Sequence, residues 1–142
     1  MNFNVYRSLS GIQKMQINRL KRVMQDGSPK YHFDVSALAA TATEGFDIAT
    51  QFPRARKYEP LDTILIINND VVDISVLVNG AGGDLLIVPA GTIRRSTRDE
   101  VPAISRISVT NLDAGVAVTV NLIDIEIWRS PEDADSLARR DV

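Results

Sequence analysis

The chain contains no cysteine among its 142 residues, one histidine, and few aromatic residues, which make up 6% of the sequence. The absence of cysteine excludes disulfides, thiolate metal sites and cysteine nucleophiles. His32 is the one candidate base for a Ser-His-Asp triad, and no G-x-S-x-G nucleophile elbow accompanies it. We therefore expect a protein that is not an enzyme and has no cofactor, and we interpret His32 as an exposed or capping residue.

Long apolar runs are also missing, because no stretch approaches the roughly 20 residues that a membrane helix needs. The N-terminal "MNFNVYRSLSG" has no apolar segment followed by a small-residue cleavage site, so it does not resemble a secretion signal. Hydrophobic residues at 44% and charged residues at 24% are typical of a globular chain. These features predict one soluble domain, made in a cytoplasm, without a membrane partner.

A net charge of −2 gives no reason to expect nucleic acid as a partner, and no aromatic residue is interleaved with basic ones for base stacking. The charge is unevenly distributed, since basic residues dominate 1–31 and acidic residues dominate 131–142. Such asymmetry can orient a chain against an oppositely charged neighbour, including a second copy. The candidate interface residues are Lys14, Arg19, Lys21, Arg22, Arg54, Arg56, Lys57, Arg94, Arg95 and Arg98.

The first part of the chain, residues 1–57, has weak periodicity and is predicted to form an N-terminal arm. A Ser10-Gly11-Ile12-Gln13 capping box, followed by an apolar stripe, predicts a helix near 11–25. The segment "FDIATQF" predicts a short strand near 46–52. Small residues without a clear period make a poor isolated core, so we expect this arm to lie on another surface.

Residues 58–130 have the pattern of consecutive strands, and 131–142 form an acidic tail. In "VVDISVLV" apolar and polar residues alternate, as in a half-buried strand. Further strands follow at short intervals, separated by Gly, Asn, Asp and Pro turns without a helix between them. The pattern predicts an all-β fold, an antiparallel β-sandwich or jelly roll of about six to eight strands.

Two apolar patterns raise the question of what covers the outer faces. The last strand, "VAVTVNLIDIEIW", changes parity after Leu122, which predicts a β-bulge or sharp bend near Asn121 to Ile123. Otherwise its two halves face different layers, one of them a neighbouring subunit. The run "ILII" at 64–67 covers both faces of a strand, so an arm or another protomer is expected to cover its outer face.

The stretch "VLVNGAGGDLLIV" resembles a dinucleotide-binding turn, but the third glycine of G-x-G-x-x-G would fall on Leu85. Pro89 follows too soon for the helix whose N-terminus would hold the phosphates. A β-hairpin explains the glycines better, because tight reversals need positive φ angles. Gly80, Gly82 and Gly83 are therefore predicted to form a hairpin tip.

Acidic residues occur in two places that suggest a metal or a carboxylate pair. Asp124 and Glu126 share one strand face, which we interpret as the solvent face of an amphipathic strand. The turn Asn68-Asn69-Asp70, with Asp73, offers oxygens to Ca²⁺ but lacks the spacing of an EF-hand loop. We predict no metal site.

The order of motifs in "ILIINNDVVDISVLVNGAGGDLLIVPAGTIRRS" and "ISRISVTNLDAGVAVTVNLIDIEIW" resembles that of small β-sandwich accessory proteins of bacteriophage particles. The shared features are an "NN-D" turn, a strand ending in "VNG", a "VPAGT" corner and a long last strand, over about residues 60–130. The resemblance implies a decoration, vertex or neck protein assembled around a symmetry axis. The family has no catalytic residues to carry over, and the long N-terminal part departs from its pattern.

The sequence and this resemblance together lead to a functional expectation. We expect a non-enzymatic structural component of a phage or virus particle, a capsid decoration, cementing or vertex protein assembled in the host cytoplasm. Its expected partners are the major capsid protein and further copies of itself, as a trimer or pentamer. The alternative is a receptor- or carbohydrate-binding β-sandwich module of a phage particle, in which loops carry the recognition.

Overall fold

The computed structural model describes residues 11–97 and 103–131, except for the side chains of 19–25. The described residues fall into two units. One contains the helix α2, Gly11–Asp26, at the position where the capping box predicts a helix. The other, Pro29–Arg129, contains every described strand.

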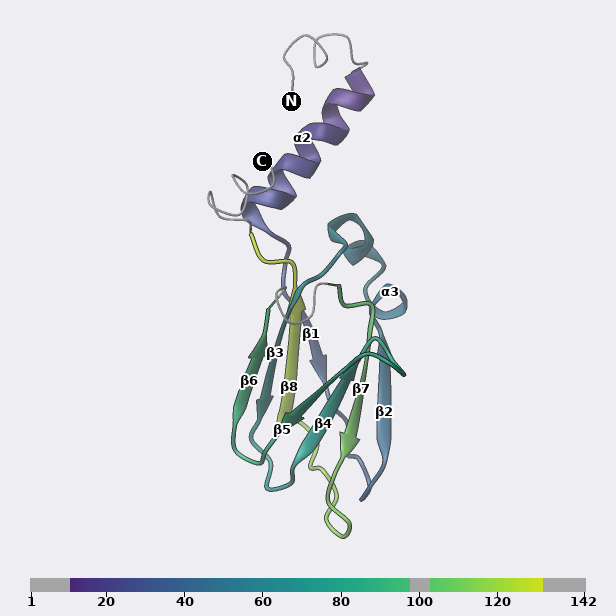
Figure 1. The fold of residues 1–142 in the computed structure, drawn as a ribbon, viewed down its shortest axis with the longest axis vertical. Helices are drawn as coiled ribbons and strands as arrows, with labels where there is room; N and C mark the ends of the chain where they lie inside the picture. Colours follow the sequence, from purple (N-terminus) through teal and green to yellow (C-terminus); the bar gives the residue numbers. More distant parts are fainter. Residues whose placement is uncertain (1–10, 98–102, 132–142) are drawn as a thin grey trace. The chain divides into compact units, whose positions relative to one another are not determined.

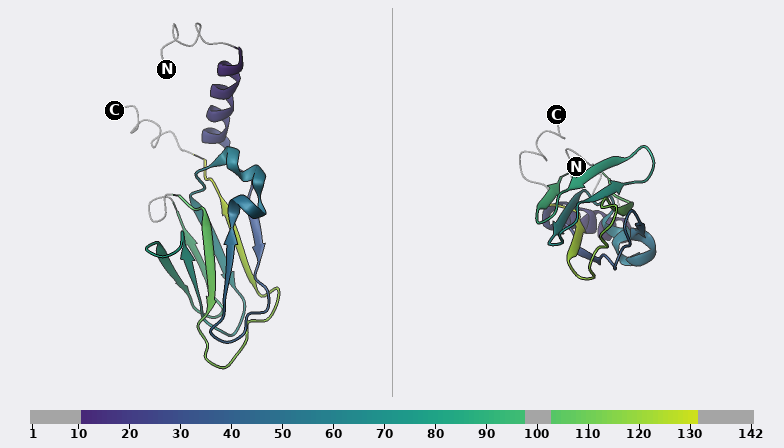
Figure 2. Two further views of the ribbon diagram at one scale, coloured as in Figure 1. Left: turned by 90° about the vertical axis from the view of Figure 1, so that its right-hand side faces the viewer. Right: turned by 90° about the horizontal axis from the view of Figure 1, so that it is seen from below.

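The second unit is a sandwich of two four-stranded antiparallel sheets, with strand orders β1-β8-β3-β6 and β2-β7-β4-β5 (Figures 1 and 2). The prediction of an all-β antiparallel sandwich is therefore confirmed. The paired strands include β1 with β8, β2 with β7, β3 with β6 and β4 with β5, which is the pairing of a jelly roll. The strands are β1 (Tyr31–Asp34), β2 (Thr43–Asp47), β3 (Thr63–Asn68), β4 (Ile74–Val78), β5 (Asp84–Val88), β6 (Ile93–Ser96), β7 (Arg106–Asn111) and β8 (Ile123–Trp128).

The core lies between the two sheets and is built from alternate residues of the central strands. Ile64 and Ile66 of β3, and Ile125 of β8, are completely buried, as are Val76 and Val78 of β4. Burying each such side chain contributes about 1.5–3 kcal/mol. The intervening residues of β3 and β8 lie on the outer face of their sheet, because successive side chains of a strand point to opposite faces.

The predicted boundary of the sandwich at residue 58 is wrong, because β1 and β2 both lie in the segment interpreted as an arm. β1 pairs with β8 and β2 pairs with β7, so this segment forms one edge strand of each sheet. β1 has only four residues. Its alternation of Tyr31 and Phe33 with polar residues is too short to separate from the Ala- and Thr-rich chain around it.

The strand predicted near 46–52 is displaced toward the N-terminus. β2 ends at Asp47, and the next residues form two short helices, α3 (Ile48–Gln51) and the 3₁₀ helix η1 (Pro53–Tyr58). Asp47 ends the strand because its carboxylate accepts hydrogen bonds from the backbone N–H groups of Ala49 and Thr50. This N-cap stabilises a helix by about 1 kcal/mol, and the apolar pattern alone did not reveal it.

The long last strand is also shorter than predicted, since β8 begins only at Ile123. Residues 116–122 form a loop with a sharp bend at Asn121, whose φ is +67°. The bend that the parity change predicted is therefore present, although it precedes the strand. Val118 is buried in the core, whereas Val116 and Val120 are about half exposed.

The glycines after β4 form the predicted hairpin. Val78 pairs with Asp84, and the Gly83 N–H donates a hydrogen bond of 2.9 Å to the Gly80 carbonyl. Asn79, Gly80 and Gly82 have positive φ angles. No helix follows, so the geometry of a phosphate-binding βα turn is excluded.

Candidate interaction surfaces

The loops that follow β1, β3, β5 and β7 gather at one end of the sandwich, opposite the end where β1 begins and β8 finishes (Figure 1). We call this end the apolar loop end, because aliphatic side chains are exposed on it. Val71 after β3 is 81% exposed, and Leu112, Val116 and Val120 after β7 are each about half exposed. None of the four loops contains an aromatic residue.

Asn68, the last residue of β3, connects the loop after β3 to the loop after β5. Its side chain is completely buried. The Nδ2 group donates hydrogen bonds to the carbonyls of Val72 at 2.9 Å, Val88 at 3.1 Å and Pro89 at 3.3 Å. Its Oδ1 accepts from the Asp70 N–H at 3.0 Å. The "NN-D" turn of the sequence is therefore a structural crosslink between the loops.

Asn111, the last residue of β7, makes an equivalent set of contacts. Its Nδ2 donates to the carbonyls of Leu38, Ala39 and Val116, and its Oδ1 accepts from the Asp113 N–H. Both strands thus end in an Asn-x-Asp sequence in which the buried amide binds carbonyls of neighbouring loops. Because buried polar groups without partners are costly, this arrangement fixes the loop conformations.

The aspartates of the two Asn-x-Asp sequences also bind backbone groups. Asp70 is buried and accepts from the N–H groups of Val71 at 2.6 Å and Thr119 at 2.7 Å. Asp113 accepts from the N–H groups of Gly115 and Val116, and these hydrogen bonds lower the pKa of its carboxyl group. Of the residues considered for Ca²⁺, Asn68, Asp70 and Asp73 each use a side-chain oxygen to accept a hydrogen bond from a backbone N–H group.

The N-terminal set of candidate interface residues lies on α2. Lys14 is half-buried. The side chains of Arg19, Lys21 and Arg22, and the whole of Arg98, lie outside the described residues. Their predicted role at an interface stays a prediction.

The second set lies together on one element. Arg54, Arg56 and Lys57 are exposed cations on η1, where the Lys57 ammonium lies 5.2 Å from the centre of the Tyr58 ring. Arg54 also lines a pocket of about 330 Å³ with Tyr31, Gln51, Phe52 and Pro53.

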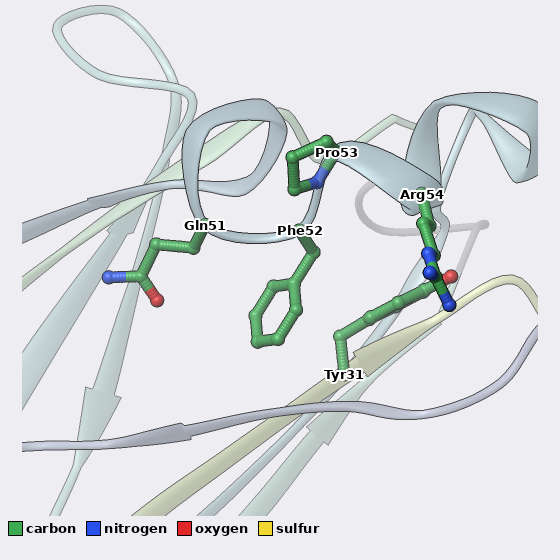
Figure 3. Close-up of a pocket in the computed structure, with 5 residues that line it drawn as sticks. All are labelled: Tyr31, Gln51, Phe52, Pro53 and Arg54. Carbon is green, nitrogen blue, oxygen red and sulfur yellow. The ribbon is translucent and has the colours of Figure 1, made fainter.

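Two aromatic rings form the wall of this pocket (Figure 3). The ring of Phe52 projects between the side chains of Gln51 and Tyr31, and its centre lies 5.1 Å from that of Tyr31. Phe52 also packs edge-on against Phe33, at 5.0 Å. Burial, reinforced by the neighbouring Tyr58, raises the pKa of the Tyr31 phenol. The pocket thus offers an aromatic wall and a guanidinium group.

The side chains of Arg94 and Arg95, adjacent residues of β6, contact different parts of the protein. The Arg94 guanidinium donates to the Ile87 carbonyl of β5 at 3.1 Å, so it connects edge strands of the two sheets. Arg95 lies on the outer face of its sheet, 5.5 Å from the centre of the Trp128 ring, and Lys30 lies 4.8 Å from the same ring. These cation–π contacts give no local signal in the sequence, because their partners are far apart along the chain.

Exposed apolar side chains also lie on both sheets. Leu85 and Ile87 of β5 are 57% and 43% exposed, and Ile93 of β6 is 67% exposed. Ile93 lies beside Ile67 of β3, whose side chain is half-buried on the same outer face. Among the described residues the outer face of "ILII" is thus partly open, and its coverage by an arm or another protomer stays a prediction.

Four ionisable residues form a cluster on the outer face of β1 and β8, which we call the His32 cluster. In the register of these strands His32 lies opposite Glu126, and Asp34 lies opposite Asp124. The His32 Nε2 atom lies 2.8 Å from Oδ1 of Asp34 and 3.5 Å from Oδ1 of Asp124. Asp124 and Glu126 lie on the outer face of their strand, as the sequence predicts. Their contact with His32 and Asp34 on the neighbouring strand was not predicted.

Contacts within this cluster shift three pKa values. The hydrogen bond to Asp34, and then the surrounding carboxylates, raise the pKa of His32 against the effect of burial. The same hydrogen bond lowers the pKa of Asp34. Burial and the hydrogen bond with Asp34 raise the pKa of Asp124.

The raised pKa of His32 predicts a measurable pH dependence. We expect the resonance of this single histidine to titrate above its ordinary value of 6.5, and the midpoint to fall in Asp34→Asn. A raised pKa in the folded state means that the contact stabilises the protein below pH 6.5 and that this contribution is lost as the pH rises through the raised pKa. NMR titration of protein without a histidine tag measures both midpoints, and equal midpoints would contradict the assigned contact.

Comparison with protein-family models gives no match for this chain, and comparison with curated proteins gives none either. Among the described residues, no helix is both long and apolar enough to cross a membrane.

Proposed function

We propose that this chain is a non-enzymatic structural component of a phage or virus particle, a decoration, cementing or vertex protein that attaches to the capsid lattice. The observation that carries the proposal is the strand order, since the eight-stranded jelly roll is a recurrent architecture of virion proteins. The same fold also occurs in lectins and cupins, so the fold alone does not establish the function. The exposed apolar surfaces also support the proposal.

The apolar loop end supports attachment to a protein surface. Its exposed apolar side chains are aliphatic, and the buried residues Asn68, Asn111 and Asp70 fix the loops that present them. A preformed surface loses little conformational entropy on binding, which favours affinity. The exposed Leu85 and Ile87 on β5 offer a separate contact for further copies of the chain, in a trimer or pentamer.

Changes at the apolar loop end test this proposal. We expect Val71→Ser with Val116→Ser to weaken binding to capsids at least about 10-fold, because each lost apolar contact contributes about 1 kcal/mol. Both side chains are exposed, so folding should be unaffected. The measurement is co-sedimentation with empty capsids of the particle in which mass spectrometry detects the chain.

The control is Leu85→Ser with Ile87→Ser, which changes exposed apolar residues on β5 and should retain capsid binding by single chains. Equal binding by the wild type and the loop-end variant would contradict attachment through this end. Absence of the chain from purified particles would contradict the virion role itself.

A second candidate function is a receptor- or carbohydrate-binding module, which the pocket beside Tyr31 favours. Sugars stack on aromatic rings and bind polar side chains, and this pocket combines two rings with the Gln51 amide and the Arg54 guanidinium (Figure 3). Glycan binding that Tyr31→Ala abolishes would favour this function over capsid attachment.

A further inference from the structure

The His32 cluster has a charge arrangement that a sheet surface normally avoids. Asp34 and Asp124 occupy directly opposed positions of two antiparallel strands, where like charges are destabilising. Glu126 lies on the same face, opposite His32, and adds a third carboxylate. Among the described residues the ion pairs of this cluster are those that His32 makes with Asp34 and Asp124.

The nearest cations on this sheet face are directed elsewhere. Lys30, two residues before His32, lies over the Trp128 ring, and Arg95 lies over the same ring. In the register of the sheet, Leu65 lies between Arg95 and Glu126. The cluster therefore combines one imidazole and three carboxylates without a described lysine or arginine in contact.

The donor atoms have the spacing of a metal site. One ligand atom each from His32, Asp34 and Asp124 lies within 4.8 Å of the other two. Metal–ligand bonds of about 2.0–2.2 Å in a tetrahedron place ligand atoms about 3.3–3.6 Å apart. The separation of 3.5 Å between His32 Nε2 and Asp124 Oδ1 already fits, and that of 2.8 Å to Asp34 Oδ1 needs to open by less than about 1 Å.

We propose that His32, Asp34 and Asp124 bind a divalent transition-metal ion, with Zn²⁺ as the best match, on the outer face of β1 and β8. Imidazole nitrogen with carboxylate oxygens is a ligand set that suits zinc, whereas Mg²⁺ and Ca²⁺ prefer sites made of oxygens alone. Solvent supplies the remaining coordination position, because the three side chains are partly exposed. The ion links the edge strand β1 to the central strand β8.

This site does not include the exposed valines of the proposed attachment surface, because its three ligands lie on strands β1 and β8 and not in the loops after β3 and β7. Strand β1 is only four residues long, and it is an edge strand of its sheet. A metal bridge from Asp34 and His32 to Asp124 adds a connection between strands that are otherwise held by backbone hydrogen bonds. The consequence is greater stability of the sandwich when the ion is bound.

The full chain without a histidine tag tests the proposal by two measurements. We expect one Zn²⁺ per chain in calorimetry, with a saturable change of the resonance of His32, the single histidine. We expect the melting temperature to rise by at least about 5 °C at zinc concentrations about 100-fold above the dissociation constant. Mg²⁺ at the same concentration should leave the His32 resonance unchanged.

Three variants decide the outcome. His32→Gln and Asp124→Asn should each abolish the calorimetric binding, and Asp34→Asn should weaken it at least about 10-fold while relieving the repulsion between the opposed carboxylates. Asp84→Asn, an exposed carboxylate of β5, should bind zinc as the wild type does. The proposal is overturned if zinc leaves the His32 resonance unchanged, or if Asp34→Asn and Asp124→Asn bind zinc as tightly as the wild type.

Discussion

Replacing Asn68 by aspartate is expected to lower the free energy of unfolding by about 4 kcal/mol. The Nδ2 group of Asn68 donates to the carbonyls of Val72, Val88 and Pro89. Aspartate has nearly the same shape, but it places an oxygen against these carbonyl oxygens and removes both donors. Because Asn68 is completely buried, water cannot replace the lost partners, and the carboxylate would have to be protonated or remain as an uncompensated charge.

The adjacent residue supplies a matched control. Asn69 is exposed, so Asn69→Asp introduces the same chemical change and charge with an expected effect within about 0.5 kcal/mol. Urea unfolding of both variants at neutral pH gives the comparison. A difference of less than about 1 kcal/mol between them would mean that the Asn68 amide does not hold the loops together.

The Asn68→Asp variant should also change the apolar loop end, which is the proposed attachment surface. The loops after β3 and β7 carry the exposed valines, and the Thr119 N–H of one loop donates to the Asp70 carboxylate of the other. A variant that releases the loops should therefore weaken capsid binding without removing an apolar side chain. We therefore expect stability and the proposed attachment to be linked at this end, because the same backbone contacts would serve both.

The central strands could be predicted from the sequence because their signal is local. The alternation around Ile74 and Val76 follows the two-residue period of a strand, and Asn79-Gly80 is a short-range hairpin signal. The short strands β1 and β2 lacked such a signal, since their apolar residues are few and their pairing partners lie about 60–95 residues away. Their positions depend on long-range pairing, which a local pattern does not encode.

Among the candidate sites, too, those formed by consecutive residues could be predicted, and those formed by residues far apart in the sequence could not. The glycines of the hairpin tip were correctly placed because a turn is defined by consecutive residues. The His32 cluster and the cations over Trp128 depend on the register of β8 with its neighbours. A sequence met alone contains these side chains, but it does not specify which of them lie opposite one another.

Replacing Gly83 by alanine is expected to cost at least about 3 kcal/mol in free energy of unfolding, because the hairpin leaves no room for a side chain there. An added Cβ would lie 1.8 Å from the Val78 carbonyl oxygen and 2.9 Å from that of Gly80. Both obstacles are backbone atoms. Val78 is buried and paired with Asp84, so the chain would have to give up the first pair of the β4–β5 ladder to avoid the contact.

Two other glycines serve as controls that separate the steric effect at Gly83 from conformational strain of the backbone. Gly82 has a φ of +84° with open space around it, so Gly82→Ala should cost only about 1–2 kcal/mol from the left-handed backbone. Gly115 is near no backbone atom and its φ is not positive, so Gly115→Ala should change stability by less than about 0.5 kcal/mol. In urea denaturation, Gly83→Ala should lose the most stability, Gly82→Ala less, and Gly115→Ala the least. If Gly83→Ala is no less stable than Gly82→Ala, the hairpin can move away from the added methyl group, and the tip is not too closely packed for a side chain at Gly83.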